Sequence, residues 1–143
     1  MILGGLLAGV VIDAFEWLAH GFIFANDWSV VMQSLNRPAT FSVKQLIALD
    51  LWGFLTGFAG MWLYAAIRPR FGAGPKTAVI AGAAMWFTNY ALGGAFPVIT
   101  HIFPRRLAAV SMLIGLVVFV VATLVGAAIY KEESQPLGRA AGV

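Results

Sequence analysis

Long apolar runs, separated by short polar or proline-containing breaks, dominate the chain. Each run has about the 20 residues that a helix needs to cross the hydrocarbon core of a bilayer. The predicted transmembrane helices are residues 2–24, 43–67, 77–96 and 107–130. Between the first two runs, apolar positions recur at helical spacing, which predicts a short interfacial helix over residues 28–36. We therefore expect an all-α fold, an integral membrane four-helix transmembrane bundle with one short interfacial helix.

The whole of residues 1–131 is expected to form this single transmembrane domain, and residues 132–143 are expected to be a disordered tail. Ser42 and Gln45 have the spacing of a capping box at the start of the second run. The polar turn 68–76 holds two prolines, two glycines and three cations. Prolines and glycines break helices, and the cations keep this turn outside the bilayer. Its cluster of charge predicts that the N- and C-termini are cytoplasmic.

Composition agrees with a membrane protein. Hydrophobic residues make up 61% of the chain and charged residues 10%, whereas about a quarter of the residues in soluble domains are charged. The absence of cysteine excludes disulfides, thiolate metal sites and a cysteine nucleophile. The net charge of +3 is small and spread over the breaks, so we expect the lipid bilayer as a partner and no nucleic acid. No Lys or Arg precedes the first run, so it is expected to be a retained span and not a signal peptide.

The first run carries three ionisable residues, which is unusual for a transmembrane helix. At about 100° per residue, Asp13, Glu16 and His20 fall within an arc of roughly 60°. Gly5 and Gly9 extend the same stripe toward the N-terminus. Lipid would leave the charges unsatisfied, so this face is expected to contact protein or water.

Polar residues in the other runs reach similar depths when residues are counted from each interface. The candidate proton- or ion-binding residues are Asp13, Glu16, His20 and Asp50, and the supporting polar residues are Asn89 and Ser111. Small residues allow helices to approach closely. The predicted helix-packing glycines are Gly5, Gly9, Gly53, Gly57, Gly82 and Gly115.

Inward-facing carboxylates and an imidazole are typical of a cation site. If a metal binds, Asp13, Glu16 and His20 are its expected ligands. A di-iron bundle needs Glu-x-x-His pairs on two helices, and the chain has none. Bis-histidine haem ligation would require the loop residue His101 to fold inward. No hydrolase motif is present, so we expect no catalytic residues, and the sequence requires no cofactor.

Two functions fit this pattern. In the first, a polar intramembrane site binds a proton or a small cation for transport or sensing, since a carboxyl group in a low-dielectric bundle can exchange one for the other. In the second, the chain is a non-catalytic accessory subunit that packs against a larger membrane complex, and its polar residues fix helix register. Four spans enclose little cavity alone, so a homo-oligomer is also expected.

The segment 62–78, together with the interfacial segment 28–32, resembles a group of short bacterial four-span membrane proteins of unknown function. This resemblance implies a multi-pass protein of the bacterial inner membrane, and it implies no activity. One design feature is also similar to the small multidrug-resistance exporters, which place a single Glu in a glycine-bearing first span, as Glu16 is placed here. The long connection 26–43 and Asp50 depart from the exporter pattern.

Overall fold

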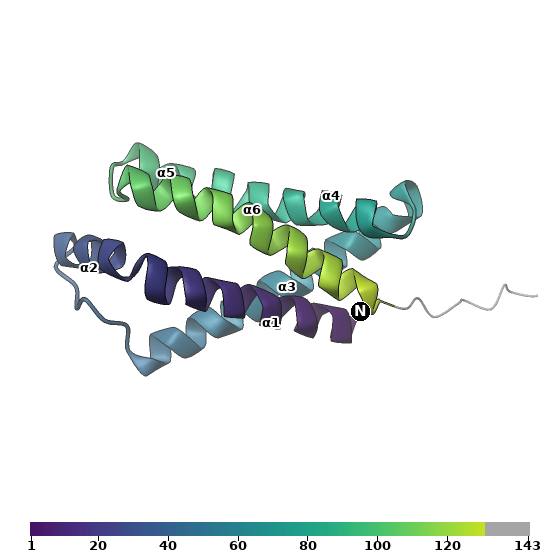
Figure 1. Ribbon diagram of the computed structural model, residues 1–143, viewed down its shortest axis with the longest axis horizontal. Coiled ribbons are helices and arrows are strands. Elements are labelled where there is room, and N and C mark those ends of the chain that lie inside the picture. Colours follow the sequence, from purple (N-terminus) through teal and green to yellow (C-terminus); the bar gives the residue numbers. More distant parts are fainter. Residues whose placement is uncertain (131–143) are drawn as a thin grey trace, which may run out of the picture.

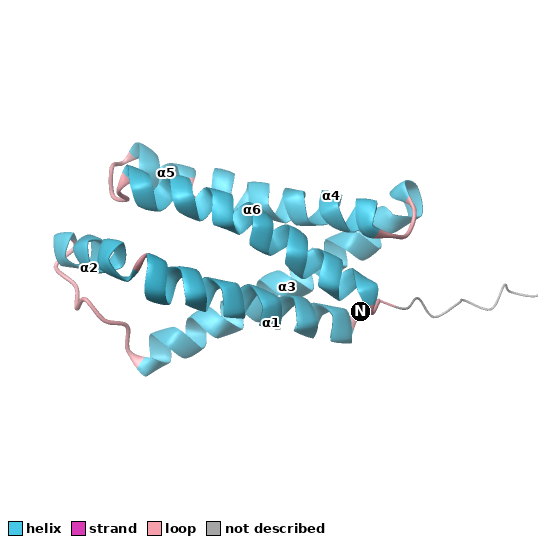
Figure 2. Cartoon of the chain, viewed as in Figure 1, coloured by secondary structure: helices cyan, strands magenta, loops and turns pink. Residues whose placement is uncertain are grey.

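The computed structural model describes residues 1–130, and every regular element in this part of the chain is a helix (Figure 2). The prediction of an all-α fold is therefore confirmed for these residues. The elements are α1 (Ile2–Leu18), the π-helical segment η1 (Ala19–Ile23), α2 (Ala25–Ser34), α3 (Val43–Phe71), α4 (Pro75–Trp86), the π-helical segment η2 (Phe87–Leu92), α5 (Ala95–Ile99) and α6 (Arg105–Ala128). The predicted tail, 132–143, lies outside the described residues.

The long helices lie lengthwise in two packed pairs (Figure 1). One pair is α1 with α3, the other is α4 with α6, and α1 also packs on α6. The N-terminus, the end of α6 and the turn between α3 and α4 lie at one end of the molecule, while α2 and the turn between α5 and α6 lie at the other. Successive long helices therefore run in alternating directions.

Among residues 1–130, three helices are long and apolar enough to cross a membrane: Ile2–Ile23, Val43–Phe71 and Arg105–Ala128. The segment 77–96, expected to be one helix, is divided instead. Its α-helical part ends at Trp86, a π-helical segment continues to Leu92, and the chain then turns before α5. The turn after η2 has a local reason, because Gly93 and Gly94 form it and Pro97 in α5 has no N–H with which to continue a preceding helix.

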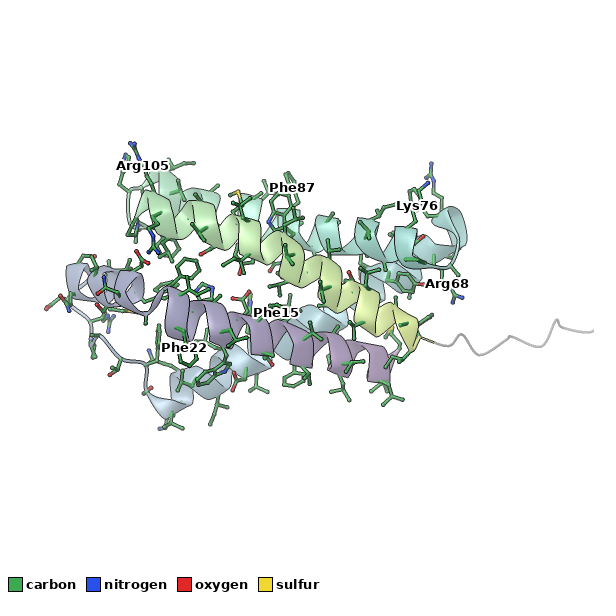
Figure 3. All side chains as sticks on the ribbon, viewed as in Figure 1. Phe15, Phe22, Arg68, Lys76, Phe87 and Arg105 are labelled. Carbon is green, nitrogen blue, oxygen red and sulfur yellow. The ribbon has the colours of Figure 1, made fainter. Side chains whose placement is uncertain are left out.

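Basic side chains lie at the two ends of the molecule, and many exposed apolar side chains lie between them. Figure 3 shows Arg105 at one end and Arg68 and Lys76 at the opposite end, with labelled phenylalanines in between. Phe22 is 77% exposed and Phe87 is 50% exposed. An apolar surface between two charged ends is what a membrane-spanning bundle presents to lipid.

The capping box predicted at the start of α3 is confirmed. The Ser42 hydroxyl accepts a hydrogen bond from the Gln45 backbone N–H at 3.4 Å, and the Gln45 side chain accepts one from the Ser42 backbone N–H at 2.8 Å. These bonds satisfy backbone donors that the first helical turn leaves unpaired. The box therefore defines where the second long helix begins.

Glycines set the closest approaches between the helices. A Cβ at Gly57 would lie 2.8 Å from the carbonyl oxygen of Gly5, and also against the backbone of Gly9. A Cβ at Gly82 would lie 2.7 Å from the carbonyl oxygen of Phe119. Gly57 thus brings α3 against α1, and Gly82 brings α4 against α6, with backbone meeting backbone in both seams.

A small second core fixes α2 against the rest of the molecule. It consists of Ala19, Phe24, Val31 and Leu107, all buried. An ion pair between Asp27 and Arg106 joins α2 to the first turn of α6 outside this core. These contacts position the first turn of α2, which carries Trp28, next to η1 at the end of the first long apolar helix.

Candidate functional site

Glu16 lies at the centre of the polar contacts between the two helix pairs. The Tyr90 hydroxyl donates a hydrogen bond to Glu16 Oε1 at 2.6 Å, and His20 Nε2 lies 2.9 Å from Glu16 Oε2. The Glu16 side chain is 28% exposed. Both oxygens of the carboxylate are therefore engaged, one by a neighbour on the same helix and one by a residue 74 positions away in η2.

The contacts of His20 define which of its ring nitrogens carries a proton. The indole N–H of Trp28 donates to His20 Nδ1 at 2.7 Å. An indole N–H can only donate, so Nδ1 must hold a lone pair. The proton of the neutral ring is then on Nε2, where it is donated to Glu16. We call these four side chains, Trp28, His20, Glu16 and Tyr90, the Glu16 network.

The backbone at His20 explains why Trp28 reaches it. The segment η1 has π-helical hydrogen bonding, and the Phe24 N–H bonds to the carbonyl of Ala19 at 2.9 Å. The chain then changes direction at the buried Phe24 and begins α2. As a result, the ring centroids of His20 and Trp28 lie 5.7 Å apart.

Tyr90 reaches Glu16 because α6 leaves room for its ring. A Cβ at Gly115 would lie 2.6–2.8 Å from three atoms of the Tyr90 ring. The ring also packs edge-on against Phe119, with 6.0 Å between centroids. Near the same point, the Trp86 indole donates to the carbonyl of Met112 at 2.8 Å. Gly115 is thus a packing residue, but its neighbour is an aromatic ring and not a helix backbone.

Asp13 and Asp50 lie in the seam between α1 and α3. The Asp13 carboxylate occupies the space that a Cβ at Gly53 would fill, and its Cγ lies 2.8 Å from that position. Within the described part of the chain, the buried Oδ2 of Asp13 has no hydrogen-bond partner. Asp50, three residues before Gly53, accepts a hydrogen bond from the Trp17 indole at 3.0 Å.

The structure therefore divides the predicted site into two groups. Glu16 and His20 bond to each other, while Asp13 and Asp50 lie to one side, close enough to interact electrostatically with each other. Asp13 also interacts electrostatically with Glu16. Among residues 1–130, no three His, Asp or Glu side chains are arranged to hold a metal ion, so Asp13, Glu16 and His20 do not form a ligand set in this conformation.

Asn89 and Ser111, the two predicted supporting residues, do not belong to the Glu16 network. The Asn89 side-chain amide donates to the carbonyl of Met85 at 2.9 Å, within its own helix. The Ser111 hydroxyl is buried, and no other group in residues 1–130 bonds to it. Both residues line a cavity of about 330 Å³ that His20 and Tyr90 also border. They are therefore neighbours of the Glu16 network and do not bond to it.

Sequence reasoning missed three aromatic members of these groups. Trp17, Trp28 and Tyr90 provide the donors that meet Asp50, His20 and Glu16. Trp28 carried a local signal, because it follows its partner His20 by eight residues, but Trp17 did not, because its partner Asp50 is 33 positions away. Tyr90 carried no such signal, because its partner is remote in the chain.

No protein-family model, curated protein or solved structure that was compared with the chain matches it.

Proposed function

We propose that the chain is a multi-pass protein of the bacterial inner membrane, in which α1–η1, α3, α4–η2 and α6 form a four-helix transmembrane bundle and α2 lies at the interface. We propose further that the Glu16 network, with Asp13 and Asp50 beside it, holds an exchangeable proton or small cation for transport or sensing. The cation cluster at the turn between α3 and α4 favours a cytoplasmic location for that end of the molecule, with both termini.

The observation that carries this proposal is the position of Glu16. It lies in an apolar helix of membrane-spanning length, and it bonds to two partners, one of which comes from the opposite helix pair. An ionisable side chain at the centre of a transmembrane helix costs roughly 2.5–3.5 kcal/mol on insertion scales. Interhelical hydrogen bonds in membranes average only about 0.6 kcal/mol. Fixing helix register does not account for such a cost.

The unpartnered oxygen of Asp13 supports the same proposal. A buried carboxylate oxygen without a donor is unfavourable, and a proton or a bound cation would satisfy it. Asp13 lies within electrostatic reach of both Glu16 and Asp50. Neutralising Asp13 with a proton or a cation would lower its repulsion with each of these two carboxylates.

A second candidate function is favoured by the outer side of the α1–α3 seam. Trp17, which holds the carboxylate of Asp50, is 51% exposed. A polar pair on a surface that would otherwise face lipid is better satisfied when protein covers it. This feature favours assembly with a second copy of the chain or with a larger membrane complex, in which the chain would be an accessory subunit.

Proton or cation movement in liposomes tests the transport role. Protein would be reconstituted with a pH-sensitive dye inside, and internal pH would be followed after an imposed gradient of H⁺ or of Na⁺. We expect flux with the wild type and at least a tenfold slower rate with Glu16→Gln, which retains shape but cannot ionise.

The matched control is Glu132→Gln, which makes the same chemical change at a residue that follows the last apolar run in the sequence, and it should leave the rate unchanged. Equal rates in all three proteins, at the level of empty liposomes, would contradict the transport role. The accessory-subunit hypothesis would then be favoured.

A further inference from the structure

A cavity of about 330 Å³ lies beside the Glu16 network, between the η2–α5 region and α6. Figure 1 shows α5 lying next to the first turns of α6 at this end of the molecule. Apolar side chains form most of the wall, with Trp28 closing the side nearest α2. Its volume is at the lower end of the range of about 300–1,000 Å³ found for small-molecule sites.

The polar side chains that line this cavity are those of His20, Trp28, Asn89, Tyr90 and Ser111. Within residues 1–130, no Asp, Glu, Lys or Arg borders it. His20 and Tyr90 border it but are already bonded to Glu16. The Ser111 hydroxyl is buried with no partner in the described chain. A mostly apolar wall with one free hydroxyl matches a neutral ligand that has an apolar body and one hydrogen-bonding group.

The backbone around the cavity points to a binding role as well. Both π-helical segments found in residues 1–130 border it, η1 through His20 and η2 through Asn89 and Tyr90. Short π-helical turns inside helices occur frequently at functional sites. Gly93 and Gly94 also line the cavity, and a Cβ at either position would meet a carbonyl oxygen of the preceding turn. The irregular backbone of residues 87–94 therefore forms part of the cavity wall.

We propose that this cavity binds a small neutral organic molecule with an apolar body and a single hydroxyl group, which exchanges a hydrogen bond with Ser111. The inference goes beyond the proposed proton or cation site and does not depend on it. Glu16 does not line the cavity, so binding should persist when Glu16 is neutralised.

Benzyl alcohol is a suitable probe, because three analogues with the same ring test each part of the proposal. Toluene lacks the hydroxyl, benzylammonium carries a positive charge, and benzoate carries a negative charge. Binding to the full chain in nanodiscs would be measured by ligand-detected saturation-transfer NMR, with empty nanodiscs to subtract partition into lipid. We expect saturable binding of benzyl alcohol that is tighter than that of the three analogues.

Two substitutions on α6 form a matched pair. Ala108 lines the cavity and Ala109 is exposed, so Ala108→Phe should abolish binding while Ala109→Phe should not. Ser111→Ala keeps the cavity open and removes only the hydroxyl, and we expect binding roughly 2- to 12-fold weaker, as for loss of one hydrogen bond. Glu16→Gln should bind benzyl alcohol like the wild type.

Three results would overturn the proposal. Equal binding by Ala108→Phe and Ala109→Phe would show that the probe binds elsewhere. Equal affinity for toluene and benzyl alcohol, unaffected by Ser111→Ala, would show an apolar crevice without a hydroxyl site. Preference for benzylammonium would show a cation site. If Glu16→Gln alone lost binding of benzyl alcohol, the cavity would not be independent of the Glu16 network. If Glu16→Gln lost ion flux but still bound benzyl alcohol, the cavity proposal would stand.

Discussion

Replacing Gly57 with alanine is expected to destabilise the folded protein by about 1–3 kcal/mol. The new Cβ would lie 2.8 Å from the carbonyl oxygen of Gly5 and 2.8 Å from the Cα of Gly9. Both are backbone atoms, so no side-chain rotation can relieve the clash and α1 must move away from α3. The same movement would displace Asp13 from its place against Gly53. The measurement is the free energy of unfolding of the purified protein by titration with a denaturing detergent.

Gly21→Ala is the control for this substitution. Gly21 is exposed, and among the side chains of residues 1–130 its added Cβ would approach within 4 Å only Trp17, at 3.9 Å. The same chemical change should therefore be neutral or stabilise the helix by up to about 1 kcal/mol. If the two variants lose stability equally, close packing at Gly57 is not what holds α1 against α3.

Replacing Gly115 with alanine is expected to cost a similar amount, about 1–3 kcal/mol, for a different reason. The added Cβ would lie 2.6–2.8 Å from three atoms of the Tyr90 ring. The ring can escape only by turning away from α6, and this movement would withdraw the Tyr90 hydroxyl from Glu16. The variant should therefore lose both packing between η2 and α6 and one of the two bonds that hold Glu16, which unfolding measurements would detect.

A smaller side chain at position 90 should relieve the clash. In the double variant Gly115→Ala/Tyr90→Leu, we expect the two single effects to be less than additive, with an interaction energy of about 0.5–3 kcal/mol. Tyr130→Leu is the control, because Tyr130 packs on Tyr64 and Arg68 and not on Gly115. Strict additivity of Gly115→Ala with Tyr90→Leu would contradict the contact between them.

Helix type and approximate ends could be predicted from local signals in the sequence. The apolar runs and the Ser42–Gln45 spacing are patterns within a single helix, so they can be recognised from residues that are near each other in the sequence. The division of the 77–96 segment was not predicted, although Gly93, Gly94 and Pro97 mark it. A π-helical turn differs from an α-helical turn by one residue and has no clear compositional signature. The two π-helical turns, at His20 and at Asn89, were therefore not predicted from the sequence.

The hydrogen-bond partners of the site residues could not be predicted from the sequence of one helix, because most of them lie on another helix. Helical periodicity puts Glu16 and His20 one turn apart on one face of the first run, and in the structure His20 Nε2 lies 2.9 Å from Glu16 Oε2. Counting residues from the interface estimated the depth of Asp50, but depth does not define which side of α3 faces α1. In the structure, Asp50 accepts a hydrogen bond from Trp17, and Glu16 accepts one from Tyr90. Rotation of one helix about its axis relative to another is set by packing across the whole seam.

The most direct test of the central claim is the nitrogen-15 NMR spectrum of His20 in the reconstituted protein. The chain has two histidines, so His101→Gln leaves only the signals of His20. The Glu16 network predicts a neutral ring with a bare Nδ1 that accepts from Trp28 and a protonated Nε2 that donates to Glu16. Trp28→Phe should shift the Nδ1 signal, and Glu16→Gln should shift the Nε2 signal. A proton on Nδ1, or signals that neither substitution changes, would contradict the network and the function proposed for it.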